Sequence, residues 1–113
     1  TRVVLCTGKV YYDLLAEAEE SRVTHVALVR IEQLYPLSQK QLTALKAKYK
    51  HVKDWAWVQE EPENMGAWSH IMRHLSAFNL RCISRPACGS PAGGNSKHHQ
   101  KVQADLVKSA LKK

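Results

Sequence analysis

The first candidates for chemistry are three carboxylates in the segment QEEPENMGAW, residues 59–68: Glu60, Glu61 and Glu63. Two carboxylates that face one cleft from different elements can act as a general acid and a general base. Glu60 and Glu61, however, are adjacent at the end of an expected strand, where neighbouring side chains point to opposite faces. A metal site would want more oxygen ligands and no stiff proline in its loop. The segment therefore predicts neither a catalytic residue nor a metal site.

A structural or interface turn explains the same segment better. Asn64 can cap the following helix, and Glu61 can complement the positive end of that helix's dipole. Gly66 in the first helical turn would let another backbone approach closely, and Trp68 would supply a large buried or interface surface. We therefore predict that Glu60, Glu61, Asn64, Gly66 and Trp68 belong to a structural or interface turn.

Two histidines have the spacing of zinc ligands on a helix, because His70 and His74 are four residues apart. The glutamate of an HExxH motif is missing between them. The apolar face of the expected helix is taken by Trp68, Met72 and Leu75, which leaves both histidines near solvent. The pattern does not predict a metal site.

A glycine-rich segment, GSPAGGNSK at residues 89–97, has the glycine spacing of a phosphate-binding loop, but Asn95 stands where the lysine of that motif belongs. A glycine loop that opens a helix is still a physical anion site. The alternatives are a flexible loop with a capping residue, and an internal ion pair of Arg85 with a glutamate of the 60–63 turn. The residues predicted to bind an anionic effector are Ser96, Lys97, Arg85 and, if the sheet order places it alongside, Arg30.

The length indicates one domain spanning residues 1–113, and 44% hydrophobic residues with a net charge of +7 fit a globular domain. No apolar run approaches the roughly 20 residues of a membrane span. The opening TRVVLCTG reads as a strand, so we expect a fragment of a longer protein. Three cysteines without a CxxC pair fit a reducing compartment, and Cys6 is expected in the core. The basic segment 96–113 suggests a polyanion partner or a solvated helix face, and it lacks the interleaved aromatic residues of a nucleic-acid binder.

Apolar periodicity predicts strict alternation of strands and helices. The expected strands are 2–8, 25–31, 54–60 and 80–84, and the expected helices are 9–21, 38–50, 64–78 and 97–113. Such alternation is typical of a three-layer α/β fold, a mostly parallel sheet flanked by helices. Ligands in these folds bind at the carboxyl ends of the strands.

Several segments together resemble a known family: VLCTGKVYYDL, VRIEQLYPL, WVQEEPENMGAW, SRPACGSPAGG and SKHHQKVQADLVKSAL. They are similar to the C-terminal domain of the decarboxylating first component of the 2-oxoglutarate dehydrogenase complex, which has the transketolase C-terminal-domain-like fold. The resemblance covers nearly the whole chain. Cys88 is a departure, because relatives usually carry alanine or serine there.

The resemblance implies a homodimeric, thiamine-diphosphate-dependent oxidoreductase of the tricarboxylic acid cycle, in the bacterial cytoplasm or the mitochondrial matrix. The full-length enzyme would decarboxylate 2-oxoglutarate and pass the succinyl group to the lipoyl carrier of dihydrolipoyl succinyltransferase. Thiamine diphosphate and Mg²⁺ would bind the preceding domains of the same chain. This domain would hold no catalytic residue, would support the dimer, and in some relatives would bind acetyl-CoA or a nucleotide effector. A free-standing anion- or nucleotide-binding regulatory module is the alternative, with no nucleic-acid or membrane partner expected in either case.

Overall fold

The computed structural model describes residues 1–32, 37–85 and 96–112, and only the backbone of residues 96–99. Strands and helices alternate along the chain as predicted. The strands are β1 (Arg2–Cys6), β2 (Val26–Arg30), β3 (Asp54–Pro62) and β4 (Arg81–Arg85). The helices are α1 (Val10–Glu20), α2 (Gln39–Lys48), α3 (Trp68–His74), a 3-10 turn (Ser76–Phe78) and α4 (Ser96–Leu111).

The four strands form one parallel sheet in the order β2-β1-β3-β4. Apolar, β-rich sequences occupy its centre, where β1 is buried over Val3–Cys6 and β3 over Trp55–Gln59. Strands buried on both faces are expected to be continuously apolar, which is the pattern of both segments. The register of β3 against β4 shifts near its end, because Val58 pairs with Ile83 but Pro62 pairs with Arg85. Four steps along β3 thus match two along β4, and the surplus forms a bulge at residues 59–61.

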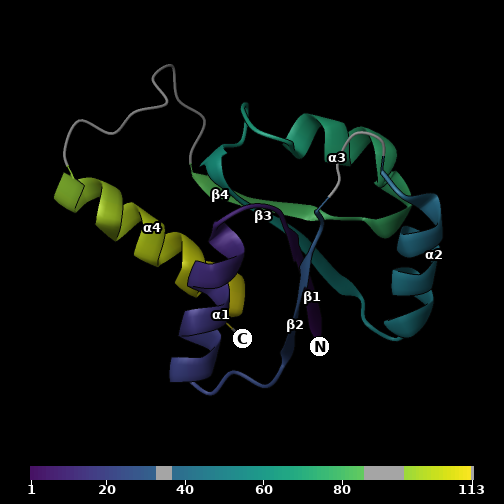
Figure 1. Cartoon of the computed structure of the whole chain (residues 1–113), viewed down its shortest axis with the longest axis horizontal. Coiled ribbons are helices and arrows are strands. Elements are labelled where there is room, and N and C mark those ends of the chain that lie inside the picture. Colours follow the sequence, from purple (N-terminus) through teal and green to yellow (C-terminus); the bar gives the residue numbers. More distant parts are fainter. Residues whose placement is uncertain (33–36, 86–95, 113) are drawn as a thin grey trace.

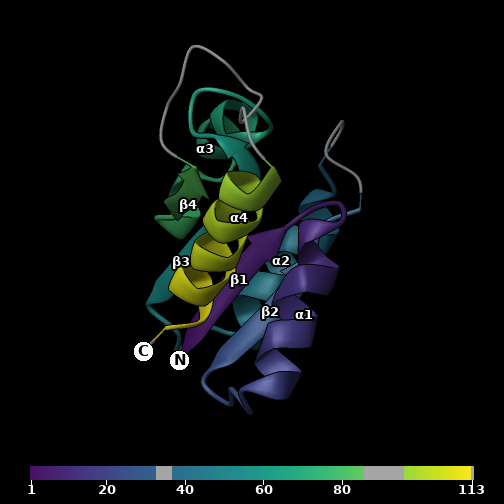
Figure 2. The same ribbon diagram turned by 90° about the vertical axis from the view of Figure 1, so that its left-hand side faces the viewer.

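Helices cover both faces of the sheet, so the predicted three-layer α/β fold is confirmed (Figures 1 and 2). Alternate strand residues point to opposite faces. On one face, Val4 and Val58 pack with Leu14 of α1 and with Leu106 and Ala110 of α4. The other face, which packs against α2 and α3, is formed by Leu5, Trp57, Leu42, Ile71 and Leu75.

Helix α3 departs from the expected range of 64–78, because it begins only at Trp68 and ends at His74. The expected cap at Asn64 is wrong, since Ala67 occupies the N-cap position. The expected apolar face is also partly wrong, because Met72 is 54% exposed while Ile71 is fully buried. In a helix of 3.6 residues per turn, positions 68, 71 and 75 share a face, and position 72 lies at its edge on the side away from position 71. Ser38, by contrast, caps α2 as predicted by accepting from Gln41 N at 3.3 Å.

A small cluster of ion pairs connects the amino ends of β1, β3 and β4. The carboxylate of Asp54 in β3 accepts from Arg2 Nε of β1 at 2.8 Å and from Arg81 Nε of β4 at 2.9 Å. Arg2 also donates to the carbonyl oxygen of Ala110 in α4 at 2.8 Å. Hydrogen bonds from Arg81 and then Arg2 lower the pKa of Asp54.

No helix within residues 1–32, 37–85 and 96–112 combines the length and the apolar character that crossing a membrane requires.

Candidate functional site

The carboxyl end of the sheet brings charged residues from all four strands to the face covered by α1 and α4. Arg30 ends β2, Lys9 follows β1, Glu60 lies near the end of β3, and Arg85 ends β4. This edge of a parallel sheet is where α/β proteins usually bind ligands. It is therefore the first place to look for a functional site.

Glu60 is the centre of a polar cluster at this edge, which we call the Glu60 cluster and which consists of Lys9, Asp13, Glu60, Arg85 and Gln103. Lys9 Nζ donates to Glu60 Oε1. Gln103 Nε2 of α4 donates to Glu60 Oε1 at 2.8 Å and to Asp13 Oδ2 of α1 at 3.0 Å. Arg85 in turn donates to Gln103 Oε1 at 2.9 Å. The cluster thus connects the ends of β3 and β4 to both helices on this face.

The contacts of the Glu60 cluster match a stabilising role. The hydrogen bond from Lys9 to Glu60 raises the pKa of the Lys9 ammonium above its ordinary value. The Glu60 side chain is only 19% exposed, whereas that of Lys9 is 75% exposed. Glu60 Oε1 accepts hydrogen bonds from both Lys9 Nζ and Gln103 Nε2. The negative charge of the carboxylate is thus partly balanced by the Lys9 ammonium. Glu60 is therefore engaged in internal contacts that join the end of β3 to α1 and α4.

The opposite face of the same bulge is organised by Gln59, a residue that is 3% exposed. Its Oε1 accepts from Trp57 Nε1 at 3.0 Å and from Trp68 N at 3.1 Å. Its Nε2 donates to the carbonyl oxygens of Pro62 and Met65, both at 2.8 Å, and more weakly to Glu61 O at 3.2 Å. The Gln59 side chain therefore replaces missing backbone hydrogen bonds throughout the turn at 61–68.

Gly66 lies inside this turn with φ +68°. The left-handed region suits glycine, because other residues meet a steric penalty there. A β-carbon at this position would lie 2.6 Å from Glu61 Oε2 and 3.2 Å from Gln59 Oε1. The expected close backbone neighbour is therefore wrong, since the crowding comes from two side chains. Gly66 also precedes α3 rather than lying in its first turn.

The predicted opposition of Glu60 and Glu61 is confirmed. Glu60 points to α1 and α4, whereas the Glu61 carboxylate lies over Gly66 on the side of α3. The two carboxylates consequently cannot flank one substrate. Trp68 is half-buried against the core of the α2 and α3 face, so most of its surface serves packing within the chain.

The rings of His70 and His74 lie against one another at an angle of 49°, with their centroids 4.4 Å apart. Among the residues that the structure describes, no group of three or more His, Cys, Asp or Glu is placed to hold a metal ion. Cys6 is fully buried in β1, as expected of a core residue, and burial raises the pKa of its thiol to about 12.

The residues predicted to bind an effector are only partly brought together. Arg85 contacts Gln103 of α4, while Arg30 donates to Tyr12 Oη of α1 at 2.9 Å and lies over the Tyr12 ring. β1 and β3 separate the two strands, a distance of about 14 Å at the usual strand spacing. The sheet order thus does not place Arg30 alongside Arg85. The side chains of Ser96 and Lys97 lie outside the described residues, as do the glycine loop and Cys88.

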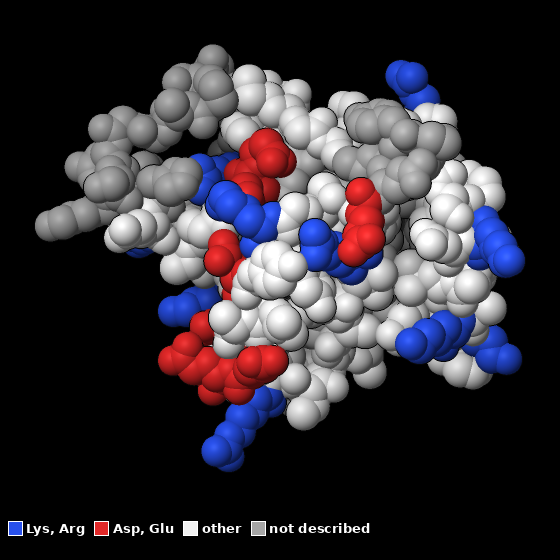
Figure 3. Space-filling model, in the orientation of Figure 1, with Lys and Arg blue, Asp and Glu red and all other residues white. Residues whose placement is uncertain are grey.

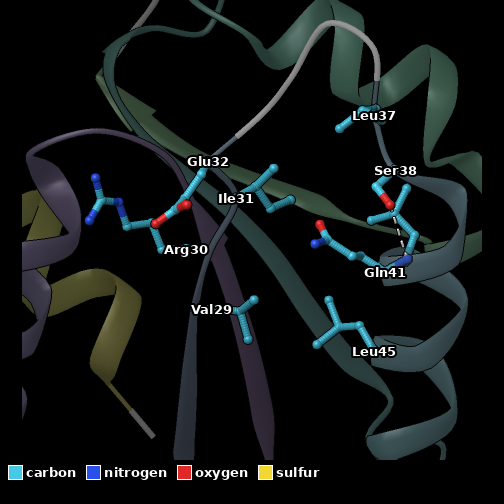
Figure 4. Close-up of a pocket in the computed structure, with 9 residues that line it drawn as sticks. Val29, Arg30, Ile31, Glu32, Leu37, Ser38, Gln41 and Leu45 are labelled. Atoms are coloured by element: carbon cyan, nitrogen blue, oxygen red, sulfur yellow. Dashed lines mark hydrogen bonds between the residues drawn. The ribbon is translucent and has the colours of Figure 1, made fainter.

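Sequence reasoning missed a cavity of about 730 Å³ between the end of β2 and the start of α2. Figure 4 shows Val29 and Ile31 directed toward Gln41 and Leu45, whereas the Arg30 side chain extends the other way, toward α1. The lining of the cavity is thus mixed, with the apolar side chains of Val29, Ile31 and Leu45 beside the polar groups of Ser38 and Gln41. No sequence signal marked it, because it arises where a helix and an edge strand diverge.

Comparison with known proteins gives a consistent result. The protein-family model described as 2-oxoglutarate dehydrogenase C-terminal matches residues 1–111. Proteins named 2-oxoglutarate dehydrogenase E1 component from Coxiella burnetii, Haemophilus influenzae and Rickettsia felis are 44%, 43% and 40% identical to this chain. These matches cover 97–98% of the chain but only 12–13% of the relatives' length.

Proposed function

The chain belongs to the 2-oxoglutarate dehydrogenase C-terminal family, and from that membership we propose that residues 1–113 form one domain at the C-terminus of a larger multidomain E1 enzyme. The full-length enzyme decarboxylates 2-oxoglutarate and transfers the succinyl group to the lipoyl carrier of dihydrolipoyl succinyltransferase in the tricarboxylic acid cycle. Support comes from relatives that match at up to 44% identity over almost the entire chain.

Within that enzyme the domain has a non-catalytic, supporting role. The observation that carries this proposal is the bulge of β3, where Glu60 and Gln59 are both engaged by other groups of the chain. Glu60 binds Lys9 and Gln103, and Gln59 uses its whole amide to hold the turn at 61–68. These are the contacts of a rigid scaffold, and a rigid scaffold is what a subunit interface or a neighbouring catalytic domain requires.

Thiamine diphosphate and Mg²⁺ are the cofactors that the family implies. A magnesium-diphosphate site needs carboxylate or carbonyl oxygens that converge on the metal, and the described residues contain no metal-binding group of three or more His, Cys, Asp or Glu. We place both cofactors in the preceding domains of the same enzyme.

The proposed partners are those preceding domains, a second subunit and the succinyltransferase, in the bacterial cytoplasm or the mitochondrial matrix. The turn at 61–68 is the surface that we propose faces the neighbouring domain or subunit. An anionic effector such as acetyl-CoA or a nucleotide is proposed near Arg85, Ser96 and Lys97. We do not include Arg30 in this effector site, because the strands β1 and β3 lie between Arg30 and Arg85.

Calorimetry and an activity assay test the proposed division of labour. The purified 113-residue chain should neither bind thiamine diphosphate nor release CO₂ from 2-oxoglutarate, whereas the full-length enzyme should do both. Circular dichroism would first verify that the isolated chain is folded. Micromolar binding of thiamine diphosphate to the folded chain would refute the placement of the cofactor outside it.

The effector proposal has its own test in the full-length enzyme. Arg85→Ala should abolish activation by acetyl-CoA or AMP while basal turnover changes little, because losing a charged phosphate contact costs about 1.5–3 kcal/mol. Arg30→Ala is the matched control and should retain activation. A lowered melting temperature with full activation retained would instead assign Arg85 to the internal contacts of the Glu60 cluster.

A further inference from the structure

Exposed positive charge gathers over α2. Figure 3 shows Lys and Arg side chains over α2 with no acidic side chain among them, and acidic side chains gathered over α1. Between Glu32 and Asp54 the chain carries no acidic residue and five lysines, at positions 40, 46, 48, 50 and 53. Exposed charge of one sign over an apolar hollow is a common mark of a docking surface.

Three of these lysines line a groove between α2 and the 3-10 turn at Ser76–Phe78. Two adjoining hollows of about 420 and 400 Å³ share Lys46, Lys50 and Phe78 in their walls, and Lys53 lines the second hollow. We call these two hollows together the basic groove. Lys46 of α2 reaches across the basic groove to the 3-10 turn. Its Nζ donates to Ala77 O at 3.4 Å and lies 5.4 Å from the Phe78 ring centroid.

The floor of the basic groove is aromatic. Trp55 packs edge-on against Phe78, with ring centroids 5.2 Å apart, and against Tyr49 at 6.3 Å. Trp55 Nε1 donates to Val52 O at 2.8 Å, and Trp55 is only 6% exposed, so the apolar surface open to the groove comes from the half-buried rings of Tyr49 and Phe78. A lysine rim above an aromatic floor fits a ligand that carries negative charge beside an apolar side chain.

The rim lysines have no acidic partner in the described part of the chain. The ion pairs present there join Arg2 and Arg81 to Asp54, and Lys9 to Glu60. Asp54 follows Lys53 directly, but both of its carboxylate oxygens already accept from the two arginines. Lys46 is placed favourably by the negative end of the α2 dipole. Lys50 and Lys53 lie beyond that helix and gain no such benefit.

We propose that the basic groove binds an acidic polypeptide segment of a partner protein, with an apolar side chain of that segment seated against the half-buried rings of Tyr49 and Phe78. The proposal is separate from the enzymatic role of the full-length protein. Nucleic acid fits less well, because it needs exposed ring faces on which bases stack. A lysine ammonium already lies over the ring of Phe78 and over that of Tyr49, so a stacking base would have to displace it, whereas an apolar side chain can contact the ring edges.

A labelled peptide tests the proposal directly. The probe is a fluorescein-labelled peptide of twelve residues, acidic except for one central phenylalanine, and its binding is followed by fluorescence anisotropy at about 50 mM salt, where screening is weak. Lys50→Glu together with Lys53→Glu should weaken binding at least tenfold, since each exposed ion pair contributes up to about fivefold and reversal adds repulsion. Lys50 and Lys53 are both exposed, as are the two lysines exchanged in the control variant described next, so folding should persist. Circular dichroism verifies it.

The matched control reverses the same number of charges elsewhere, with Lys101→Glu and Lys108→Glu on α4, and should change affinity less than about threefold. A second peptide with serine in place of phenylalanine should bind about tenfold more weakly, because burial of the aromatic ring is lost. Equal losses in the two charge variants, or equal affinity for the two peptides, would overturn the proposal. So would the absence of saturable binding, or tighter groove-dependent binding of single-stranded DNA of equal charge.

Discussion

Replacing Gln59 by leucine is the sharpest test of the turn at the end of β3. The substitution keeps the approximate volume of the side chain and removes every hydrogen bond that it makes. Trp57 Nε1 and Trp68 N lose their acceptor, and the carbonyl oxygens of Pro62 and Met65 lose their donor.

The expected loss of stability follows from burial. The bonds to Trp57 Nε1 and to Pro62 O are fully buried, whereas those to Trp68 N and Met65 O are only partly buried. An unpaired buried donor or acceptor costs about 1–3 kcal/mol, and a group that can reach water costs much less. We therefore expect Gln59→Leu to lower the free energy of unfolding by about 2–5 kcal/mol. This is a large part of the roughly 5–15 kcal/mol that holds a domain of this size.

Urea unfolding monitored by tryptophan fluorescence measures this loss, and thermal unfolding should show a fall of about 8–20 °C. Gln41→Leu, an exposed position in α2, is the matched control and should change stability by less than about 0.5 kcal/mol. Stability within about 1 kcal/mol of the unmodified chain for Gln59→Leu would refute the claim that this amide holds the turn together.

A second substitution at the same position separates hydrogen bonding from shape. In Gln59→Glu the side chain keeps its size, but a carboxylate oxygen replaces the amide that faces the Pro62 and Met65 carbonyls. Burial and these carbonyl dipoles should raise the pKa of the introduced carboxyl. The destabilisation relative to the unmodified chain is then full above this raised pKa. It fades as the pH falls toward about 4.3, the ordinary value of a glutamate, because the protonated form donates again. A pH-independent difference would contradict this account.

Other predictions address the remaining contacts. Gly66→Val should lower the melting temperature more than Gly66→Asn, because asparagine tolerates a positive φ and a β-branched residue does not; equal effects would show that backbone conformation is not decisive. In the full-length enzyme Glu60→Gln should reduce turnover less than about tenfold, since loss of a general acid or base typically costs 100-fold or more; a 1000-fold loss with an intact fold would make Glu60 catalytic. Arg81 and Arg2 lower the pKa of Asp54, so their contribution is full above about pH 3.8 and is lost as the pH falls through the depressed value in the folded state. Asp54→Asn should therefore remove about 1 kcal/mol or less near pH 7 in urea unfolding, and the loss should shrink as the pH falls below about 3.8; a loss that does not change with pH would contradict an ionic origin. With its pKa raised to about 12, the Cys6 thiol should resist iodoacetamide at pH 8 until the chain unfolds, and rapid labelling of Cys6 in the native state would count against its burial.

The amino-acid sequence by itself determined the layers of this domain. Strand and helix patterns depend on the repeat of apolar residues along a short stretch, so VVLC and WAWV could be recognised as buried strands without knowledge of their neighbours. The cap at Ser38 and the alternation of Glu60 and Glu61 are equally local. The start of α3 could not be predicted from local sequence. The bulge and the Gln59 hydrogen bonds hold residues 63–67 in a turn, whereas helix propensity alone would have begun the helix at Asn64.

Only the tertiary structure decided which side chains meet. The sequence did not distinguish Gln59 from an exposed polar residue, because its hydrogen-bond partners are defined by the fold of the turn around it. The distance between Arg30 and Arg85 depends on the strand order β2-β1-β3-β4, and the Glu60 cluster depends on α4 returning beside α1. The basic groove needs Phe78 to reach the end of α2 from a segment some thirty residues later in the chain. Such contacts join residues far apart in sequence, and they are fixed by packing of the whole sheet rather than by local propensity.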